Sequence, residues 1–215
     1  MAQPPYQSIA QDVNPDGGRH PISAIPAEKA AADRATRRSW REFPYYAQRY
    51  GQRGFKFSLS DSGWLETLPD LSVDTAIAQM HWLAGLLAAR GMPRVLLERH
   101  LAFLKLELDL IEGDLKRDFS VLTAGAESLR AACEKVLPSA TAAELAADFD
   151  SDVKHLPGSI ANMGIILVGG IADGHDGIGN ARESTLDWAR DPQRFDERWI
   201  RAVEKIEEAT CRHLR

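Results

Sequence analysis

The fold is set by residues 72–112, SVDTAIAQMHWLAGLLAARGMPRVLLERHLAFLKLELDLIE. Ser72 suits a helix N-cap, because its hydroxyl can accept a hydrogen bond from a free first-turn amide. Gly91 suits the end of that helix, and Pro93 suits the start of the next one. Apolar residues recur between these signals at spacings of four and three, which is one helix face: Val73, Ile77, Met80, Ala84 and Leu87. The sequence therefore predicts a tightly turned, antiparallel helical hairpin.

The second half of this stretch allows a competing interpretation. Residues 104–110 alternate strictly between leucine and charged residues, which is a strand pattern. Leu, Lys and Glu favour helix, however, and β-branched residues are missing from the run. We therefore expect a helix whose apolar side is formed by Leu96, Leu97, Leu101, Leu104, Leu108 and Ile111.

Two histidines of the hairpin are candidate cofactor ligands. His100 lies within the apolar stripe, and His81 lies at the flank of the first helix. Counted from the turn, both fall at similar heights, roughly 13–15 Å away at the helical rise. Facing histidines of a bundle could hold haem or another flat cofactor. No motif accompanies them, which favours structural roles, with His100 bonded to a neighbour and His81 at the surface.

Composition indicates an ordinary globular protein. The chain has 215 residues, of which 44% are hydrophobic and 27% charged, so it can bury one sizeable core. No apolar run approaches twenty residues, and the first residues do not have the pattern of a secretory signal. These features predict no membrane association and a cytoplasmic location. We divide the chain into an extended or disordered arm, residues 1–26, and a helical domain, residues 27–215.

The N-terminal part is a candidate for partner binding. Residues 1–26 are rich in Pro, Gly, Gln, Asn and Asp, which favours an extended or disordered segment. Residues 1–56 hold nine Lys or Arg against five Asp or Glu, whereas the remainder holds 17 against 26. A basic arm on an acidic body is suited to a protein partner or a homo-oligomer. Nucleic acid is not expected, because no nucleic-acid motif follows the arm.

Residues 44–71, PYYAQRYGQRGFKFSLSDSGWLETLPDL, follow a helix expected to open at Pro26 and close before Pro44. The stretch is dense in tyrosine and arginine, the residue types that dominate interface hot spots. Arginine forks would also suit an anionic ligand. A packed connector is the alternative. The candidate partner-binding residues are Tyr45, Tyr46, Arg49, Tyr50 and Arg53.

Residues 115–137 show the most regular periodicity, running from Leu115 to Val136 at alternating spacings of four and three. They predict a core-facing helix of a bundle. A capping-box pattern at Thr141 and Glu144 predicts the start of the next helix. Asp191 and Pro192 predict the start of the last one.

The segment 155–184 holds the best remaining candidate for chemistry. We expect a helix capped by Ser159, or alternatively a buried strand at residues 165–168 that leads into a glycine-rich loop. The loop at 173–180 contains two carboxylates and a histidine, Asp173, His175 and Asp176, which could bind a divalent metal. Their spacing does not match an EF-hand, and a turn with a helix cap is the simpler interpretation.

Motifs of the common enzyme classes are absent. The sequence has no Glu-x-x-His pair, no HExxH and no G-x-S-x-G, and its two cysteines lack zinc spacing. The pattern predicts an all-α fold, a single helical bundle built on the central hairpin. We hypothesise a non-catalytic helical interaction protein, an accessory or regulatory subunit of a larger assembly. The alternatives are a globin-like or other ligand-binding sensor or carrier that uses His100 or His81, and a metalloenzyme that uses residues 173–180.

Overall fold

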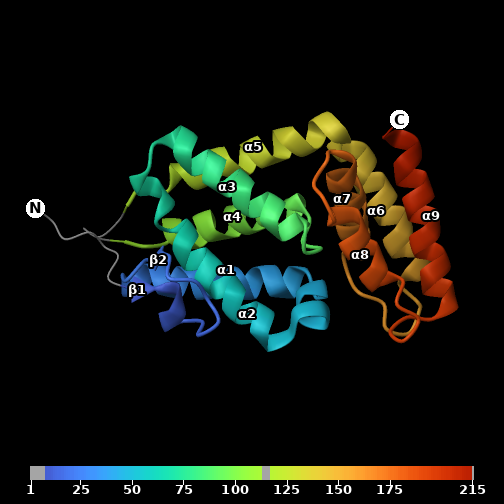
Figure 1. Cartoon of the computed structure of the whole chain (residues 1–215), viewed down its shortest axis with the longest axis horizontal. Coiled ribbons are helices and arrows are strands. Elements are labelled where there is room, and N and C mark those ends of the chain that lie inside the picture. The colour runs from blue at the N-terminus through green and yellow to red at the C-terminus, as the bar shows by residue number, and fades with distance from the viewer. Residues whose placement is uncertain (1–7, 113–116, 215) are drawn as a thin grey trace, which may run out of the picture. The chain divides into compact units, whose positions relative to one another are not determined.

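A computed structural model of the chain describes residues 8–112 and 117–214. The described part is mostly helical, as expected, and Figure 1 shows the course of its elements. The helices are α1 (Pro26–Glu42), α2 (Tyr45–Leu65), α3 (Val73–Ala88), α4 (Arg94–Asp109), α5 (Ser120–Val136), α6 (Ser139–Val153), α7 (Met163–His175), α8 (Ala181–Ala189) and α9 (Glu197–His213). Two short 3-10 turns (Ala10–Asp12 and Leu68–Asp70) and the strands β1 (Ser8–Ile9) and β2 (Pro21–Ile22) complete them. None of the described helices is both long and apolar enough to cross a membrane.

The chain divides into two compact units. The first comprises Met1–Met80 and Arg99–Ala126, and the second comprises His81–Glu98 and Glu127–Arg215. Each of α3, α4 and α5 therefore contributes residues to both units. No local sequence signal marks this division, because each of the three helices continues through the boundary.

The two helices predicted from residues 72–112 are both present. The Ser72 hydroxyl accepts a hydrogen bond from the Thr75 amide at 3.3 Å, as an N-cap does. Gly91 has a φ of 85°, which a side chain would strain, and α4 starts one residue after Pro93. The alternating stretch after Leu104 is helical as far as Asp109, so the strand interpretation is wrong there.

Two segments are helical where the sequence left another structure open. Residues 44–71 are mainly the helix α2, which is broken at Gly51 by a φ of 55° and a ψ of −158°. Residues 165–168 lie inside α7, so the buried strand is also wrong. That helix begins at Met163, after Asn162 in the left-handed conformation, and not at a cap formed by Ser159.

Several predicted helix boundaries are shifted. Thr141 lies inside α6, which already begins at Ser139. The last helix begins at Glu197, because the Asp196 side chain caps it by accepting from the Trp199 amide at 2.9 Å. The helix predicted from Leu115 begins at Ser120, and Leu115 itself lies outside the described residues.

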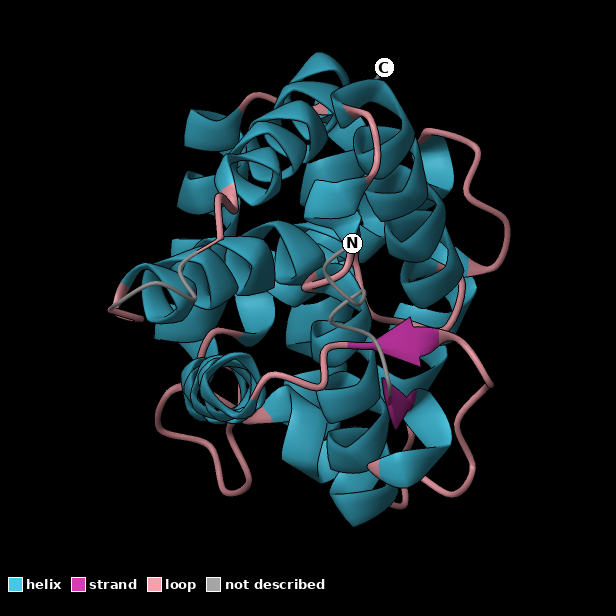
Figure 2. Ribbon diagram, turned by 90° about the vertical axis from the view of Figure 1, so that its left-hand side faces the viewer, coloured by secondary structure: helices cyan, strands magenta, loops and turns pink. Residues whose placement is uncertain are grey.

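The described part of the N-terminal segment is folded onto the first unit. Its two strands pair antiparallel, with Ser8 opposite Ile22, and Figure 2 shows them in magenta beside the helices. Ile22 is 2% exposed and packs on Gly63 of α2, where a Cβ would lie 3.1 Å from it. The Ser23 amide also donates to the Gly63 carbonyl at 3.2 Å. Residues 8–25 are thus no free arm, and residues 1–7 lie outside the described part.

In the first unit, α1 and the C-terminal half of α4 run antiparallel. Four contacts fix this arrangement, because the residue number rises along α1 as it falls along α4. The pairs are Arg34 with Glu107, Arg38 with Phe103, Ser39 with His100, and Glu42 with Arg99. We call the line of these contacts the α1–α4 seam.

In the second unit, α6, α7, α8 and α9 pack closely on one another. A Cβ at Gly164 of α7 would lie 2.3 Å from the Ala146 carbonyl oxygen of α6, so the two backbones touch there. Trp199 of α9 is 1% exposed and stacks on Phe195 with ring centroids 4.7 Å apart. Gly164 at the α6–α7 crossing and the aromatic rings at the start of α9 are thus part of the close packing of this unit.

Candidate functional site

The exposed side of α1 is strongly basic. The helix buries mainly small residues, among them Ala31, Ala32, Ala35 and Ser39, and its arginines lie on the exposed side. Its outward side chains include four arginines at spacings of three, one and three, which place them on one helix face: Arg34, Arg37, Arg38 and Arg41. The arginine-rich composition of the N-terminal part therefore gathers on a single face of α1.

A stripe of α4 lies beside this basic face. Arg99, Phe103 and Leu106 follow one another at spacings of four and three, and so share one side of α4, while Leu110 follows directly after the end of the helix. Phe103 is buried beneath two guanidinium groups, those of Arg38 at 4.3 Å and Arg99 at 5.3 Å from its ring centroid. The two leucines, in contrast, are exposed by 51% and 70%. Leucine side chains left in water at adjacent turns form a small apolar surface.

We call this combined area the seam surface: Arg34, Arg37, Arg38, Arg41 and Arg99 together with Leu106 and Leu110. Three of the five arginines have acidic partners, with N–O distances of 2.6–2.8 Å to Glu107, Asp33 and Glu42. Among the described residues, Arg38 and Arg41 have no acidic partner. The surface therefore carries a net positive charge next to exposed aliphatic groups.

A buried hydrogen-bond network around His100 fixes α1 against α2 and α4. The ring Nδ1 lies 2.8 Å from the Ser39 hydroxyl of α1, and Nε2 lies 2.8 Å from the Ser62 hydroxyl of α2. Ser62 donates its only hydroxyl proton to the Ser58 carbonyl at 2.7 Å. It must therefore accept from His100, which carries its proton on Nε2 and accepts from Ser39 on Nδ1. Burial lowers the pKa of His100 to about 4, so the ring is neutral.

The network bears on the predicted cofactor histidines. Both ring nitrogens of His100 are engaged by hydroxyl groups, and the side chain is buried. The Nε2 of His81 lies 2.8 Å from the Ser128 hydroxyl. The two histidines belong to different compact units. A haem or similar cofactor on either residue stays a prediction that the described contacts do not favour.

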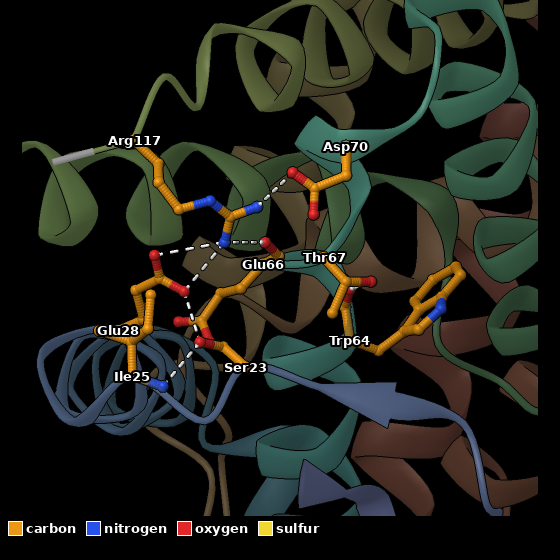
Figure 3. Close-up of polar contacts among 8 residues, drawn as sticks. All are labelled: Ser23, Ile25, Glu28, Trp64, Glu66, Thr67, Asp70 and Arg117. Carbon is orange, nitrogen blue, oxygen red and sulfur yellow. Dashed lines mark hydrogen bonds and ion pairs between the residues drawn. The ribbon is translucent and has the colours of Figure 1, made fainter. Parts of the chain in front are cut away.

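A second buried cluster fastens the start of α1, as Figure 3 shows. The guanidinium of Arg117 contacts Glu28 of α1 at 3.1 Å, the Glu66 carbonyl oxygen at 3.2 Å and Asp70 at 3.0 Å. Glu28 is only 1% exposed and also accepts a hydrogen bond from the Ser23 hydroxyl. One guanidinium thus ties the segment after α4 to the first turn of α1 and to the chain before α3.

The carboxyl group of Glu66 is the least satisfied group in this cluster. It is fully buried, and neither of its side-chain oxygens has a hydrogen-bond partner among the described residues. Its side chain extends toward Glu28 and Ser23 in Figure 3. Burial, and then the negative charge of Glu28, raise the pKa of Glu66 well above its usual range, although the charge of Arg117 opposes them. Burial and the neighbouring negative charge thus favour the neutral form of the Glu66 carboxyl group.

Two of the three residues predicted to bind a metal, Asp173 and Asp176, form ion pairs with Arg94. Asp173 and His175 lie in the last turn of α7 and not in a loop. The Arg94 side chain contacts Asp173 at 2.7 Å and Asp176 at 2.8 Å, and the Arg94 amide donates to Asp173 at 2.8 Å. Within residues 8–112 and 117–214, no group of three His, Cys, Asp or Glu side chains is arranged to hold a metal ion. The two expected carboxylate ligands, Asp173 and Asp176, therefore bind a guanidinium.

The predicted tyrosine and arginine surface is largely inside the protein. Tyr45 is 0% exposed and Tyr46 is 8% exposed, because α2 turns both rings toward the core. Arg49 and Tyr50 are half-buried, and their side chains lie together, with the guanidinium 5.3 Å from the ring centroid. Arg53 is exposed and pairs with Asp16 at 3.0 Å. Buried tyrosines cannot contact a partner, so this expectation is wrong for Tyr45 and Tyr46.

The seam surface was missed at the sequence level, although part of its signal is visible there. The spacing of the four arginines in α1 is that of one helix face, and that face carries no large aliphatic residue. We found no protein-family model, curated protein or solved structure that matches the chain. Function must therefore be argued from the surfaces and pockets of the molecule alone.

Proposed function

We propose that this chain is a non-catalytic helical interaction protein, an accessory subunit that binds a partner protein on its seam surface. The observation that carries the proposal is the exposure of Leu106 and Leu110 beside a basic helix face. Adjoining exposed apolar groups mark interaction sites, and arginine is enriched among the residues that dominate binding energy at protein interfaces.

The partner that fits this surface is an acidic amphipathic helix. The two leucines are four residues apart, at and just after the end of α4, so apolar side chains of a partner helix can cover both. Carboxylates on the flanks of such a helix would face Arg38 and Arg41, whose charges have no acidic partner among the described residues. Arginine forks bind carboxylates through two parallel hydrogen bonds, which adds specificity to the charge attraction.

The buried clusters support this role by fixing α1. The helix is held at its start by Arg117 on Glu28 and near its end by Ser39 on His100. A surface that is rigid before binding loses less conformational entropy on association than a mobile one. The proposed contact thus uses α1 and α4, in place of the N-terminal arm that the sequence suggested.

The proposal is tested by isolating the tagged chain with its partner from the native host and measuring binding of the two purified proteins. Replacing both leucines in a Leu106→Ser, Leu110→Ser variant should weaken binding by about tenfold or more, since about 1–2 kcal/mol of apolar burial is lost per leucine. An Arg38→Gln, Arg41→Gln variant should also weaken binding and reduce its salt dependence.

The matched control is Leu71→Ser, which removes another exposed leucine of the first unit, 44% exposed, outside the seam surface. It should leave binding unchanged. Unchanged binding of the double leucine variant, or equal weakening by Leu71→Ser, would reject the seam surface. Failure of any protein to accompany the chain, or its self-association in sedimentation equilibrium, would reject a separate partner.

The alternative of a sensor or carrier with haem on His100 or His81 has no described contact in its favour. An absorption spectrum of the protein purified from its host tests it directly. A haem band that disappears in His100→Ala would revive that hypothesis.

A further inference from the structure

The second unit contains a pocket at the turn between α7 and α8. Its volume is about 650 Å³, within the range of small-molecule sites. Three aliphatic residues line the pocket: Ile171 of α7, Ile178 of the turn and Leu214 after α9. Glycines of the turn bring the backbone to the pocket rim. The lining of the pocket thus combines aliphatic side chains with glycine backbone.

The lining of the pocket also includes a guanidinium that is held in place. Arg182 of α8 donates to Glu207 of α9 from Nε at 3.2 Å and from Nη2 at 2.7 Å. Arg190 pairs with the other carboxylate oxygen of Glu207. Two guanidinium groups therefore share one carboxylate, which leaves one net positive charge in this triad.

Arg182 can also bind a further acceptor. A guanidinium has five N–H donors, and Glu207 takes two of them. The side chain is 42% exposed and lines the pocket. His175 lies on the rim, and the acidic Glu183 stands beside Arg182 in the first turn of α8. An incoming anion would meet attraction from Arg182 and repulsion from Glu183.

We propose that this pocket binds a small carboxylic acid with an aliphatic tail. The carboxylate would lie on the arginine, and the hydrocarbon chain would lie on the aliphatic residues. The acid group would accept from Arg182, where charge-assisted bonds are about twice as strong as neutral ones. The tail would cover Ile178 and Leu214, which are partly exposed, and remove them from water. This site lies in the second unit and is independent of the seam surface.

Octanoate and its neutral analogue octanamide are matched probes, because they share the tail and differ in the charge. Titration of the ¹⁵N-labelled full-length chain, followed by amide chemical shifts, should show saturable binding of octanoate. The shifts should concentrate on Gly174, Gly177 and Gly179 at the pocket. Octanamide should bind at least about tenfold more weakly, because it lacks the charge that pairs with Arg182.

Variants localise the site and test the charge pattern. A Cβ at Gly179 meets no atom within 4 Å, so Gly179→Trp should fold and fill the pocket, abolishing binding. Glu183→Gln should strengthen octanoate binding by about threefold, because it removes a like charge beside the ligand. Glu197→Gln is the matched control, since this exposed residue starts α9 and is some four turns from the pocket at its end.

The outcomes decide the proposal. Saturable binding that prefers octanoate, is lost in Gly179→Trp and is strengthened only by Glu183→Gln supports it. Absence of saturable octanoate binding, equal binding of octanamide, or unchanged binding in a folded Gly179→Trp variant overturns it. If Glu183→Gln and Glu197→Gln changed octanoate affinity equally, the carboxylate of the ligand would not lie beside Glu183, and the proposed binding mode would be overturned.

Discussion

The hydroxyl of Ser62 accepts the Nε2 proton of His100 across 2.8 Å, which keeps a neutral imidazole inside the first unit. This single relationship joins α2 to α4, and through Ser39 it also reaches α1. Protonation would place a charge on this buried ring and would turn Nδ1 from an acceptor into a donor. Acid should therefore weaken the link on which the position of α1 depends.

The first prediction concerns stability in acid. The pKa of His100 is about 4 in the folded chain against 6.5 when exposed, so the unfolded state takes up the proton first as pH falls. The contribution of His100 to the free energy of unfolding should be complete above pH 6.5. It should be lost progressively towards pH 4, by about 3 kcal/mol in total. Urea unfolding of the parent and of His100→Gln at a series of pH values measures it. His155→Gln, at an exposed histidine, is the control and should retain the parental dependence.

The second prediction is the opposite dependence at Glu66. Its folded pKa lies above the 4.5 of an exposed glutamate, so stability is fully present in acid and falls as pH rises beyond 4.5. Glu66→Gln keeps the shape of the neutral side chain and removes its ionisation. The variant should be more stable than the parent at neutral pH and should lack this part of the pH dependence. A variant less stable than the parent at neutral pH would mean that Glu66 is needed in its charged form.

The third prediction is that Arg117 stabilises the buried carboxylate of Glu28. Arg117→Met removes the only arginine on this carboxylate among the described contacts and leaves Glu28 buried, which typically costs about 3–5 kcal/mol. Arg53→Met removes the exposed pair with Asp16 and should cost less than about 1 kcal/mol. Equal losses in chemical denaturation would show that the cluster contributes no more than a surface ion pair.

The helices were predictable where local signals define their ends. Ser72, Gly91 and Pro93 act through their own hydrogen bonds and dihedral angles. The residue type alone therefore predicts the effect of each on the helix end. The caps at Asn162 and Asp196 were missed for a physical reason. Asn162 begins α7 from a left-handed conformation without a side-chain cap, and Asp196 competed with an equally plausible Asp-Pro start five residues earlier.

The clusters were beyond the reach of sequence patterns, because their members are far apart in the chain. Arg94 and Asp173 are separated by 79 residues, and His100 and Ser39 by 61. Asp173 and Asp176 resemble metal ligands in sequence, and only the fold brings Arg94 to them. The tyrosines of α2 resemble a binding surface in composition, yet the fold buries Tyr45 and Tyr46.

The fourth prediction contrasts two helical glycines. At Gly164 an added Cβ would lie 2.3 Å from the carbonyl oxygen of Ala146 and 2.7 Å from its Cα, and a backbone cannot move aside as a side chain can. Gly164→Ala must therefore push α6 and α7 apart and should cost about 2 kcal/mol or more. At Gly85, inside α3, a Cβ meets no atom within 4 Å. Gly85→Ala should stabilise the chain by up to about 1 kcal/mol, because alanine loses less backbone entropy in a helix.

Urea unfolding of both variants, with circular dichroism as the probe, gives the comparison. Since both changes add one methyl group, opposite signs would isolate the effect of the α6–α7 crossing. Destabilisation of equal size at both positions would contradict the close approach of these two helices.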